Sequence, residues 1–297
     1  MPGEAIMNDR IVVGLDGSAE SLAAAHWAAR EALLRGVPLH LVHAEEWASP
    51  RDLPVPTSEV RRRWAQALLN ETAEGLRASH PELEVDIRSI DGRPAAELIG
   101  MAAAAHMIVL GSRGLGTVTG FVLGSVGMAV IQATVRPVVM VRASEDAVPR
   151  PDGRHAARDL LVGVDISRPC DALLAFAFEE AARRSCALHA LHSWSLPPLV
   201  GYGATYDPRV HAQLEMSAEA SLRDVLAPWR DKYPDVGVIA RASIGHAPTE
   251  LIERGVESGL IVVGRRIRRS SIGAHIGPVT HAVLHHAKAP VAVIAHE

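Results

Sequence analysis

Short apolar runs rich in β-branched residues alternate with longer segments of helical periodicity in the first half of the chain. The runs occupy residues 10–15, 37–44, 83–90, 107–110 and 137–142. After the first run, Leu22, Ala25, Ala29 and Leu33 recur at helical spacing, and Ser18 or Ser21 can cap that helix. Further helices are predicted over 58–79, over 93–105 and from Ser125 onward. This alternation predicts an α/β fold with a doubly wound, five-stranded parallel sheet of strand order 3-2-1-4-5.

The second half of the chain repeats the first. Residues 160–165 (LLVGVD) parallel residues 11–16 (IVVGLD), and Gly264 and Pro290 parallel Gly111 and Pro137. Two constant spacings, with a small insertion between them, indicate a duplication. We therefore predict two tandem domains of the same fold, over 1–143 and 158–297, joined by a charged, proline-rich linker over 144–157.

Composition excludes several classes of protein. The 297 residues carry a net charge of −4, which gives no reason to expect nucleic acid as the partner. Two cysteines are too few for a disulfide framework, and the first nine residues lack the apolar core of a signal peptide. The longest apolar run, 98–111, is too short to span a bilayer. We expect a soluble cytoplasmic protein with no membrane partner.

One glycine-rich stretch carries the candidate chemistry. The apolar run that ends at Leu110 leads into Gly111-x2-Gly114-x9-Gly124-Ser125, and a helix follows. Glycines let backbone N–H groups approach phosphate oxygens, and the start of a helix adds unpaired N–H groups and a positive dipole end. The lysine of a Walker A loop and the GxGxxG of a dinucleotide site are both missing. The stretch therefore predicts phosphate binding of another kind.

Together with the earlier Val-Gly-Leu-Asp-Gly-Ser at 13–18, this spacing resembles the ATP-binding subgroup of the universal stress protein family. The resemblance covers nearly the whole chain as two copies and is stronger in the first. It implies a Rossmann-like fold of the adenine nucleotide alpha hydrolase type, with ATP as ligand, with or without Mg²⁺. The ATP contacts that it implies are Gly14, Leu15, Asp16, Ala44, Leu110, Gly111, Arg113, Gly114, Gly124, Ser125, Val126 and Gly127.

The predicted topology places Asp16 beside the glycine loop. In a doubly wound sheet, strands one and four are neighbours, and ligands bind at their carboxyl ends. Asp16 there can accept hydrogen bonds from ribose hydroxyls, while the backbone at His43 and Ala44 meets the adenine edge. The alternatives are structural: Asp16 as a turn or capping aspartate, and Ser125 as a helix N-cap.

The second copy departs from the motif. Ile267 stands where Gly114 would be, and Pro278 replaces Ser125, which removes a hydroxyl and an N–H donor. We predict weak or no ATP binding at this second site, which would comprise Asp165, Ser193, Val263, Gly264 and Gly277. Four nearby arginines could hold phosphates instead, although a solvated basic loop is the favoured interpretation. They are Arg265, Arg266, Arg268 and Arg269.

Other features keep two interpretations each. His281, His285 and His286 include a zinc-like i, i+4 pair, but ordinary surface histidines are favoured because no third ligand is evident. Residues 194–208 form a lid or a variable loop. The runs at 137–142 and 290–294 would be edge strands, which invite pairing of the two copies with each other or of two chains as a homodimer.

The resemblance implies a regulatory or stress-response module that holds ATP in its first half. No residue is an obvious general base, so any ATP turnover should be slow. The alternatives are an ATPase or adenylate-transferring enzyme on the same fold, and a partner-binding protein whose cleft holds no nucleotide.

Overall fold

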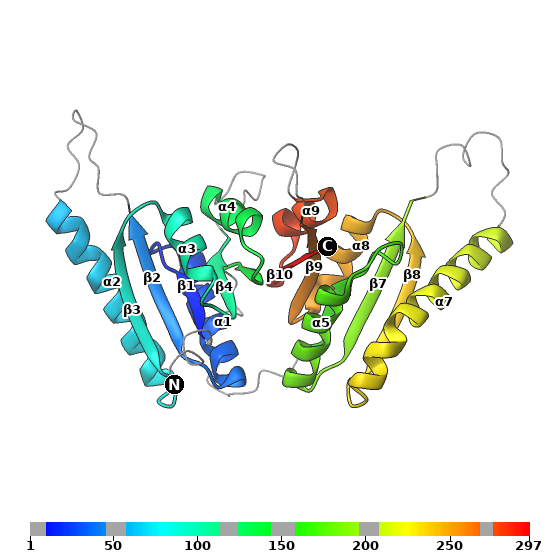
Figure 1. The fold of residues 1–297 in the computed structure, drawn as a ribbon, viewed down its shortest axis with the longest axis horizontal. Coiled ribbons are helices and arrows are strands. Elements are labelled where there is room, and N and C mark those ends of the chain that lie inside the picture. Colours follow the sequence, from blue (N-terminus) through cyan, green and yellow to red (C-terminus); the bar gives the residue numbers. More distant parts are fainter. Residues whose placement is uncertain (1–9, 46–57, 113–123, 144–157, 196–207, 268–275) are drawn as a thin grey trace, which may run out of the picture. The chain divides into compact units, whose positions relative to one another are not determined.

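The chain consists of two units, Met1–Gly153 and Arg154–Glu297, each built around five parallel strands (Figure 1). The computed structural model describes residues 10–45, 58–112, 124–143, 158–195, 208–267 and 276–297. The predicted linker over 144–157 lies outside these residues, so the predicted domain boundaries remain a prediction.

The sheet of the first unit has the strand order β3-β2-β1-β4-β5. Its strands are β1 (Ile11–Gly14), β2 (Leu39–Glu45), β3 (Val85–Asp91), β4 (Met107–Gly111) and β5 (Val138–Val141). All neighbouring pairs are parallel, and Gly14 of β1 is in register with Leu110 of β4. The predicted order 3-2-1-4-5 is therefore confirmed, with the reversal of winding between β1 and β4.

Helices cover both faces of this sheet. The helices α1 (Ala19–Arg35) and α2 (Ser58–Ser79) lie on one face, and α3 (Pro94–Ala102) and α4 (Ser125–Ala133) on the other. Ser18 caps α1 by accepting a hydrogen bond from Ser21 N–H, and Gly36, at φ 64°, ends the helix in the left-handed conformation. The α3 helix ends three residues earlier than predicted, at Ala102.

The second unit repeats this arrangement, with strand order β8-β7-β6-β9-β10. Its strands are β6 (Leu160–Gly163), β7 (Leu188–Trp194), β8 (Val238–Ile244), β9 (Leu260–Arg266) and β10 (Val291–His296). One face carries α5 (Asp171–Arg184) and α7 (Pro208–Lys232), and the other α8 (Ala247–Arg254), the short η2 (Gly255–Glu257) and α9 (Pro278–His286).

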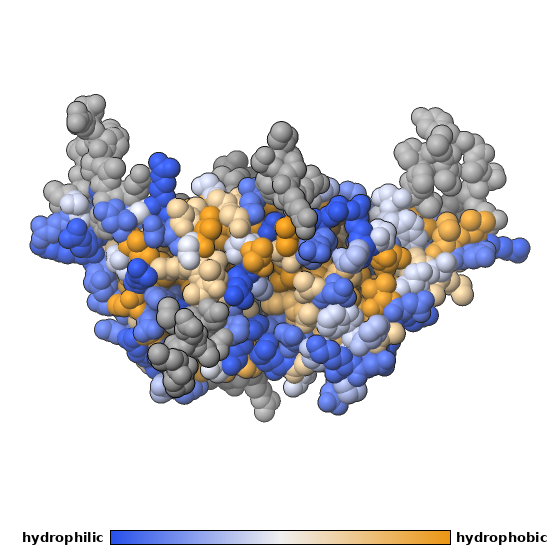
Figure 2. Space-filling view, in the orientation of Figure 1, coloured by the Kyte–Doolittle hydropathy of each residue, from blue (hydrophilic) through white to orange (hydrophobic). Residues whose placement is uncertain are grey.

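The central strands are buried on both faces, as their unbroken apolar runs require. Ile11, Val13 and Val109 are fully buried in the first unit, and Leu160 and Val262 in the second. Among the described residues, no helix is long and apolar enough to cross a membrane. Apolar atoms do reach the surface over the beginning of α7 (Figure 2), where the exposed large side chains include Val210, Leu214 and Met216.

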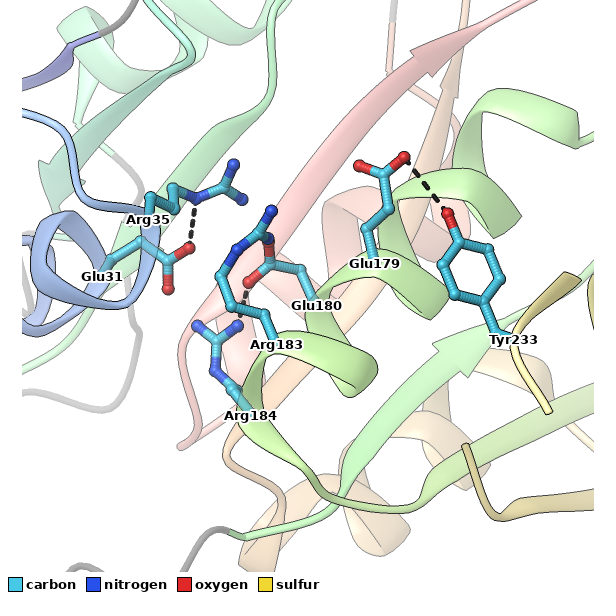
Figure 3. A network of polar contacts seen from close by, with 7 residues as sticks. All are labelled: Glu31, Arg35, Glu179, Glu180, Arg183, Arg184 and Tyr233. Carbon is cyan, nitrogen blue, oxygen red and sulfur yellow. Dashed lines mark hydrogen bonds and ion pairs between the residues drawn. The ribbon is translucent and has the colours of Figure 1, made fainter. Parts of the chain in front are cut away.

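A buried ion pair recurs at the equivalent place in both units. On α1, Glu31 is 1% exposed and pairs with Arg35; on α5, Glu180 is fully buried and pairs with Arg184 (Figure 3). Arg183 also reaches Glu180, at 2.8 Å. Removing a buried carboxylate from water is costly, so each of these glutamates depends on its arginine partners.

Candidate functional site

A cavity of about 780 Å³ opens at the carboxyl ends of β1 and β4 in the first unit. The two strands are adjacent and in register, so the segments that leave them diverge around this point. Residues nearly a hundred positions apart, Asp16 and Gly111, thus line the same cavity. Its volume lies within the range of roughly 300–1,000 Å³ typical of ligand sites.

Ten of the residues that the sequence predicts line this cavity. They are Gly14, Leu15, Asp16, Ala44, Leu110, Gly111, Gly124, Ser125, Val126 and Gly127. The other two predicted residues, Arg113 and Gly114, lie outside the described part of the chain. The structure therefore brings every described member of the predicted set to one place.

Asp16 combines a turn role with its place on the cavity. Its Oδ1 accepts hydrogen bonds from Ser18 N–H at 3.0 Å and from Ser18 Oγ at 2.5 Å. This is the turn arrangement that the sequence analysis kept as an alternative. The hydrogen bonds hold the carboxylate in place at the mouth of the cavity, where hydroxyl groups of a ligand can reach it.

The N-terminus of α4 forms the opposite wall. Gly124 is its N-cap residue, with φ −62° and ψ 150°, and as glycine it has no side chain to accept a hydrogen bond from the first turn. The suggestion that Ser125 is the N-cap is therefore wrong: Ser125 is the first helical residue, and it is exposed. Ser125, Val126 and Gly127 line the cavity, and the N–H groups of this first turn have no acceptor within the helix. Such an end attracts anions.

Glycine occupies two positions on the cavity, 111 and 124, for different physical reasons. A Cβ on Gly111 would lie 2.5 Å from the backbone nitrogen of Ser21, so close packing of β4 against α1 already requires glycine there. Gly124 has an ordinary φ, and a Cβ on it would meet no described atom within 4 Å. Neither backbone conformation nor packing explains glycine at position 124, but the close approach of a ligand would.

The α2 helix forms a further wall of the cavity, which was not predicted from the sequence. Trp64 lines the cavity, and its ring meets that of His43 edge to face, with centroids 5.4 Å apart. His43 donates its Nδ1–H to the carbonyl oxygen of Leu15, at 2.8 Å, which ties β2 to the segment leading to Asp16. Arg61, also on α2, lies 3.7 Å from Glu45. No motif marks α2; the signal available was Trp64 itself, an aromatic residue in a highly charged helix.

The remaining lining residues that the sequence did not single out are Ser21, Val42, Val60, Pro94 and Leu98. The four apolar ones lie on β2, α2 and α3, whereas Ser21 lies on α1 beside Gly111. The cavity thus has an apolar and aromatic end at β2 and a backbone-amide end at α4. Such a division suits a ligand with a flat ring system at one end and a polyanion at the other.

The second unit has a smaller cavity, of about 370 Å³, at the equivalent position. All five predicted residues, Asp165, Ser193, Val263, Gly264 and Gly277, line it. Partial burial would raise the pKa of Asp165. Hydrogen bonds from Ser167, together with the guanidinium of Arg168 at 3.5 Å, outweigh that effect and hold the pKa below its usual value.

The predicted solvated loop of arginines is partly wrong. Arg265 and Arg266 belong to β9, and Arg265 is only 5% exposed, because the strand continues past Gly264 in register with β10. Burial lowers the pKa of its guanidinium. Arg266 is exposed and lines the second cavity. Arg268 and Arg269 lie outside the described residues, as do residues 196–207 of the predicted lid or loop.

The histidines of α9 form no metal centre with their described neighbours. The rings of His281 and His285 are stacked, with centroids 4.3 Å apart. Within the described segments, no three His, Cys, Asp or Glu residues are grouped so that they could hold a metal ion. The i, i+4 pair is therefore without the third ligand that a zinc site needs.

Comparison with known proteins agrees with the duplicated fold. The sequence model of the Universal stress protein family matches residues 7–142 and again residues 157–295. Two universal stress proteins of Mycobacterium tuberculosis are each 34% identical to the chain. One alignment covers 95% of this chain and 96% of the relative, and the other covers 97% and 96%.

A solved structure shows the same fold over both copies. The crystal structure of a universal stress protein from Archaeoglobus fulgidus matches 97% of this chain and 98% of its own, with a TM-score of 0.68 and 18% identity. Three findings agree on the family: the sequence model matches twice, the relatives align over nearly their whole length, and the solved structure has the same fold. The chain belongs to the universal stress protein family, as a tandem form with two copies of the family's domain.

Proposed function

We propose that the first unit binds ATP in its cavity and holds it as a regulatory ligand in a stress-response module. The observation that carries this proposal is the pairing of the α4 N-terminus with the Asp16 turn across one cavity of about 780 Å³. Backbone amides at one wall suit phosphate oxygens, and a fixed carboxylate at the other suits ribose hydroxyls.

The parts of the nucleotide are assigned by the chemistry of the walls. The phosphates accept hydrogen bonds from the N–H groups at the start of α4, beside Gly124. The ribose donates to Asp16. The base occupies the end formed by β2 and α2, where Ala44 offers backbone groups and Trp64 an aromatic surface.

Charge favours a role for a cation in this complex. The described charged side chains that line the cavity are Asp16, Glu45 and Arg61, two carboxylates and one guanidinium. Attraction of the phosphates therefore depends on backbone N–H groups and the helix dipole, and a bound Mg²⁺ would offset part of the repulsion. We expect ATP to bind more tightly in Mg²⁺ than in EDTA, as measured by isothermal titration calorimetry.

The test is to denature freshly purified protein, identify any released nucleotide by mass and count it per chain. We expect about one ATP per chain, lost in a Gly124→Ala/Ser125→Ala variant. A Gly277→Ala variant is the matched control, because it makes the same change at the start of α9 in the second unit.

Two results would change the interpretation. A chain that releases no nucleotide and takes up none from added ATP does not bind ATP, and a partner-binding role would then remain. Steady formation of ADP, AMP or pyrophosphate during incubation with ATP would favour the enzymatic alternative.

A further inference from the structure

The half of the second cavity that lies next to β6 and β7 has the same construction as its counterpart in the first unit. His192 donates Nδ1–H to the carbonyl oxygen of Val164 at 2.9 Å, as His43 does to Leu15. Asp165 Oδ1 accepts from Ser167 N–H and Oγ, as Asp16 does from Ser18. The aromatic surface has a different origin: Trp194 belongs to β7, where Trp64 belongs to α2, and it stacks on His192 with centroids 5.3 Å apart and 13° between the rings.

The other half differs, first in its backbone. In the first unit the described pairing of β4 with β5 ends at Gly111 and Val141, and the next residue, Ser112, still donates its N–H to the carbonyl oxygen of Val141 at 2.7 Å. In the second unit β9 and β10 remain paired for two residues past Gly264, through Arg265 and Arg266. Ile267 N–H then donates to the carbonyl oxygen of His296 at 2.7 Å. Backbone that follows the glycine is thus bound to β10, where a phosphate loop would need it to turn toward the ligand.

Side chains occupy the same half. Thr280 stands at the position of Gly127, is 4% exposed and donates its hydroxyl to the carbonyl oxygen of Gly264 at 2.7 Å. His296 lies against Gly264, since a Cβ there would be 2.5 Å from its Nε2. Pro278, the first residue of α9, removes one of the N–H donors at the helix start.

We propose that the cavity of the second unit binds a free nucleoside and excludes nucleoside triphosphates. The base lies at Trp194 and the sugar hydroxyls at Asp165, in a volume of about 370 Å³ against about 780 Å³ in the first unit. The assignment of the base half rests on the proposed function of the first unit, because the two halves are built alike. The two units then respond to different members of one chemical class.

The experiment uses the full chain with ¹⁵N-labelled tryptophan, in which Trp64 reports on the first cavity and Trp194 on the second. Their indole N–H signals are assigned with Trp64→Phe and Trp194→Phe variants. We expect adenosine to shift the Trp194 signal, and ATP to shift the Trp64 signal at concentrations about 100-fold lower than any that affect Trp194. That ratio corresponds to the loss of two hydrogen bonds to phosphate.

A second variant tests the cause. In Thr280→Gly/His296→Ala, the space over Gly264 opens, and we expect the affinity for ATP reported by Trp194 to rise about tenfold, the effect of one recovered contact. Thr280→Ser/His296→Gln keeps the hydroxyl and the bulk and is the matched control, with no expected change. Thermal unfolding of each variant shows whether it is folded.

The outcomes separate the two proposals. A Trp194 signal that does not respond to millimolar adenosine, or that responds to ATP at the same concentration as Trp64, would overturn the nucleoside proposal. The second of these results would also show that Arg266, which lines the cavity, holds phosphates after all. If ATP does not shift the Trp64 signal, the proposed function of the first unit is contradicted, with or without a shift of the Trp194 signal.

Discussion

At the scale of single residues, two glycines that line the first cavity are expected to have different roles, one in packing and one in ligand binding. Gly111→Ala should destabilise the protein by about 1–3 kcal/mol, because the new methyl group would meet backbone atoms of Glu20 and Ser21 that cannot easily move. Gly124→Ala should change stability by less than about 1 kcal/mol, since φ at this N-cap position is already favourable for alanine. It should nevertheless weaken ATP binding by about tenfold or more, because the methyl group points into open space beside the amides.

Urea unfolding and calorimetric titration of the two variants measure these effects. Equal losses of stability, or unchanged ATP affinity in Gly124→Ala, would show that position 124 is a structural glycine only.

Cys170 gives a prediction about pH. Burial, with smaller contributions from Asp171 and Asp165, raises the pKa of its thiol from 9.0 to about 11. Between about pH 9 and about pH 11 the thiol keeps its proton in the folded chain but has lost it in the unfolded chain. The contribution of this thiol to stability is therefore fully present below about pH 9. It is lost as the pH rises toward about 11. We expect the free energy of unfolding to fall more steeply over this range in the wild type than in Cys170→Ala.

The absolute stability of Cys170→Ala does not enter this comparison, since a cavity left by the missing sulfur costs the same at each pH. Parallel curves for the two proteins would contradict the assignment.

At the scale of the helix, the buried ion pairs are expected to matter far more than the exposed ones. Glu180→Ala on α5 leaves Arg183 and Arg184 without the carboxylate that they share, and breaking such a buried pair costs about 3–5 kcal/mol. Glu219→Ala removes an i, i+4 pair on α7 in which Arg223 is 55% exposed, and should cost less than about 1 kcal/mol.

Both changes lie in the second unit, so the same probe can follow them. Trp229 stacks near Phe178 of α5, with ring centroids 6.1 Å apart, and its fluorescence should report unfolding of that unit. Denaturation midpoints that shift equally in the two variants would contradict the prediction.

At the scale of the whole molecule, the duplication predicts that each half can fold alone. Each unit has five parallel strands that pair with one another, helices on both faces of these strands, and its own buried core. Fragments 1–143 and 158–297, cut at the predicted boundaries, should each unfold cooperatively in urea, and the first should retain ATP.

The edge strands lead to a further prediction for these fragments. Among the five strands of the first unit β5 is the last, and among those of the second unit β10 is the last. Both strands are apolar. A free fragment exposes that edge and should form dimers, which analytical ultracentrifugation would detect as a doubled mass. Strictly monomeric fragments would remove the basis for the predicted homodimer of the full chain.

Much of the fold followed from local patterns. The strands at β1 and β4 are unbroken runs of β-branched and apolar residues, which only a sheet covered on both faces can bury. Their order followed from the alternation with helices and from the rules of doubly wound sheets. The ends of elements were less accurate, as at α3, because hydrogen bonds at a helix terminus depend on neighbours outside the local sequence.

The sequence by itself determined the duplication, the order of strands within each unit, and the place of the first cavity at the ends of β1 and β4 and the start of α4. These features depend on periodicity and on glycines at fixed spacing, which act over a few residues along the chain. The departures from the glycine motif in the second copy, Ile267 and Pro278, were also visible in the sequence.

Only the tertiary structure decided which side chains share a cavity. Trp64 and Arg61 reach the first site because α2 packs beside β2, a contact between segments that no local pattern links. Thr280 of α9 and His296 of β10 both lie against Gly264, because α9 and β10 pack beside β9 there. Packing of elements distant in sequence sets the volume and the lining of each cavity, and residue spacing along the chain carries little information about either.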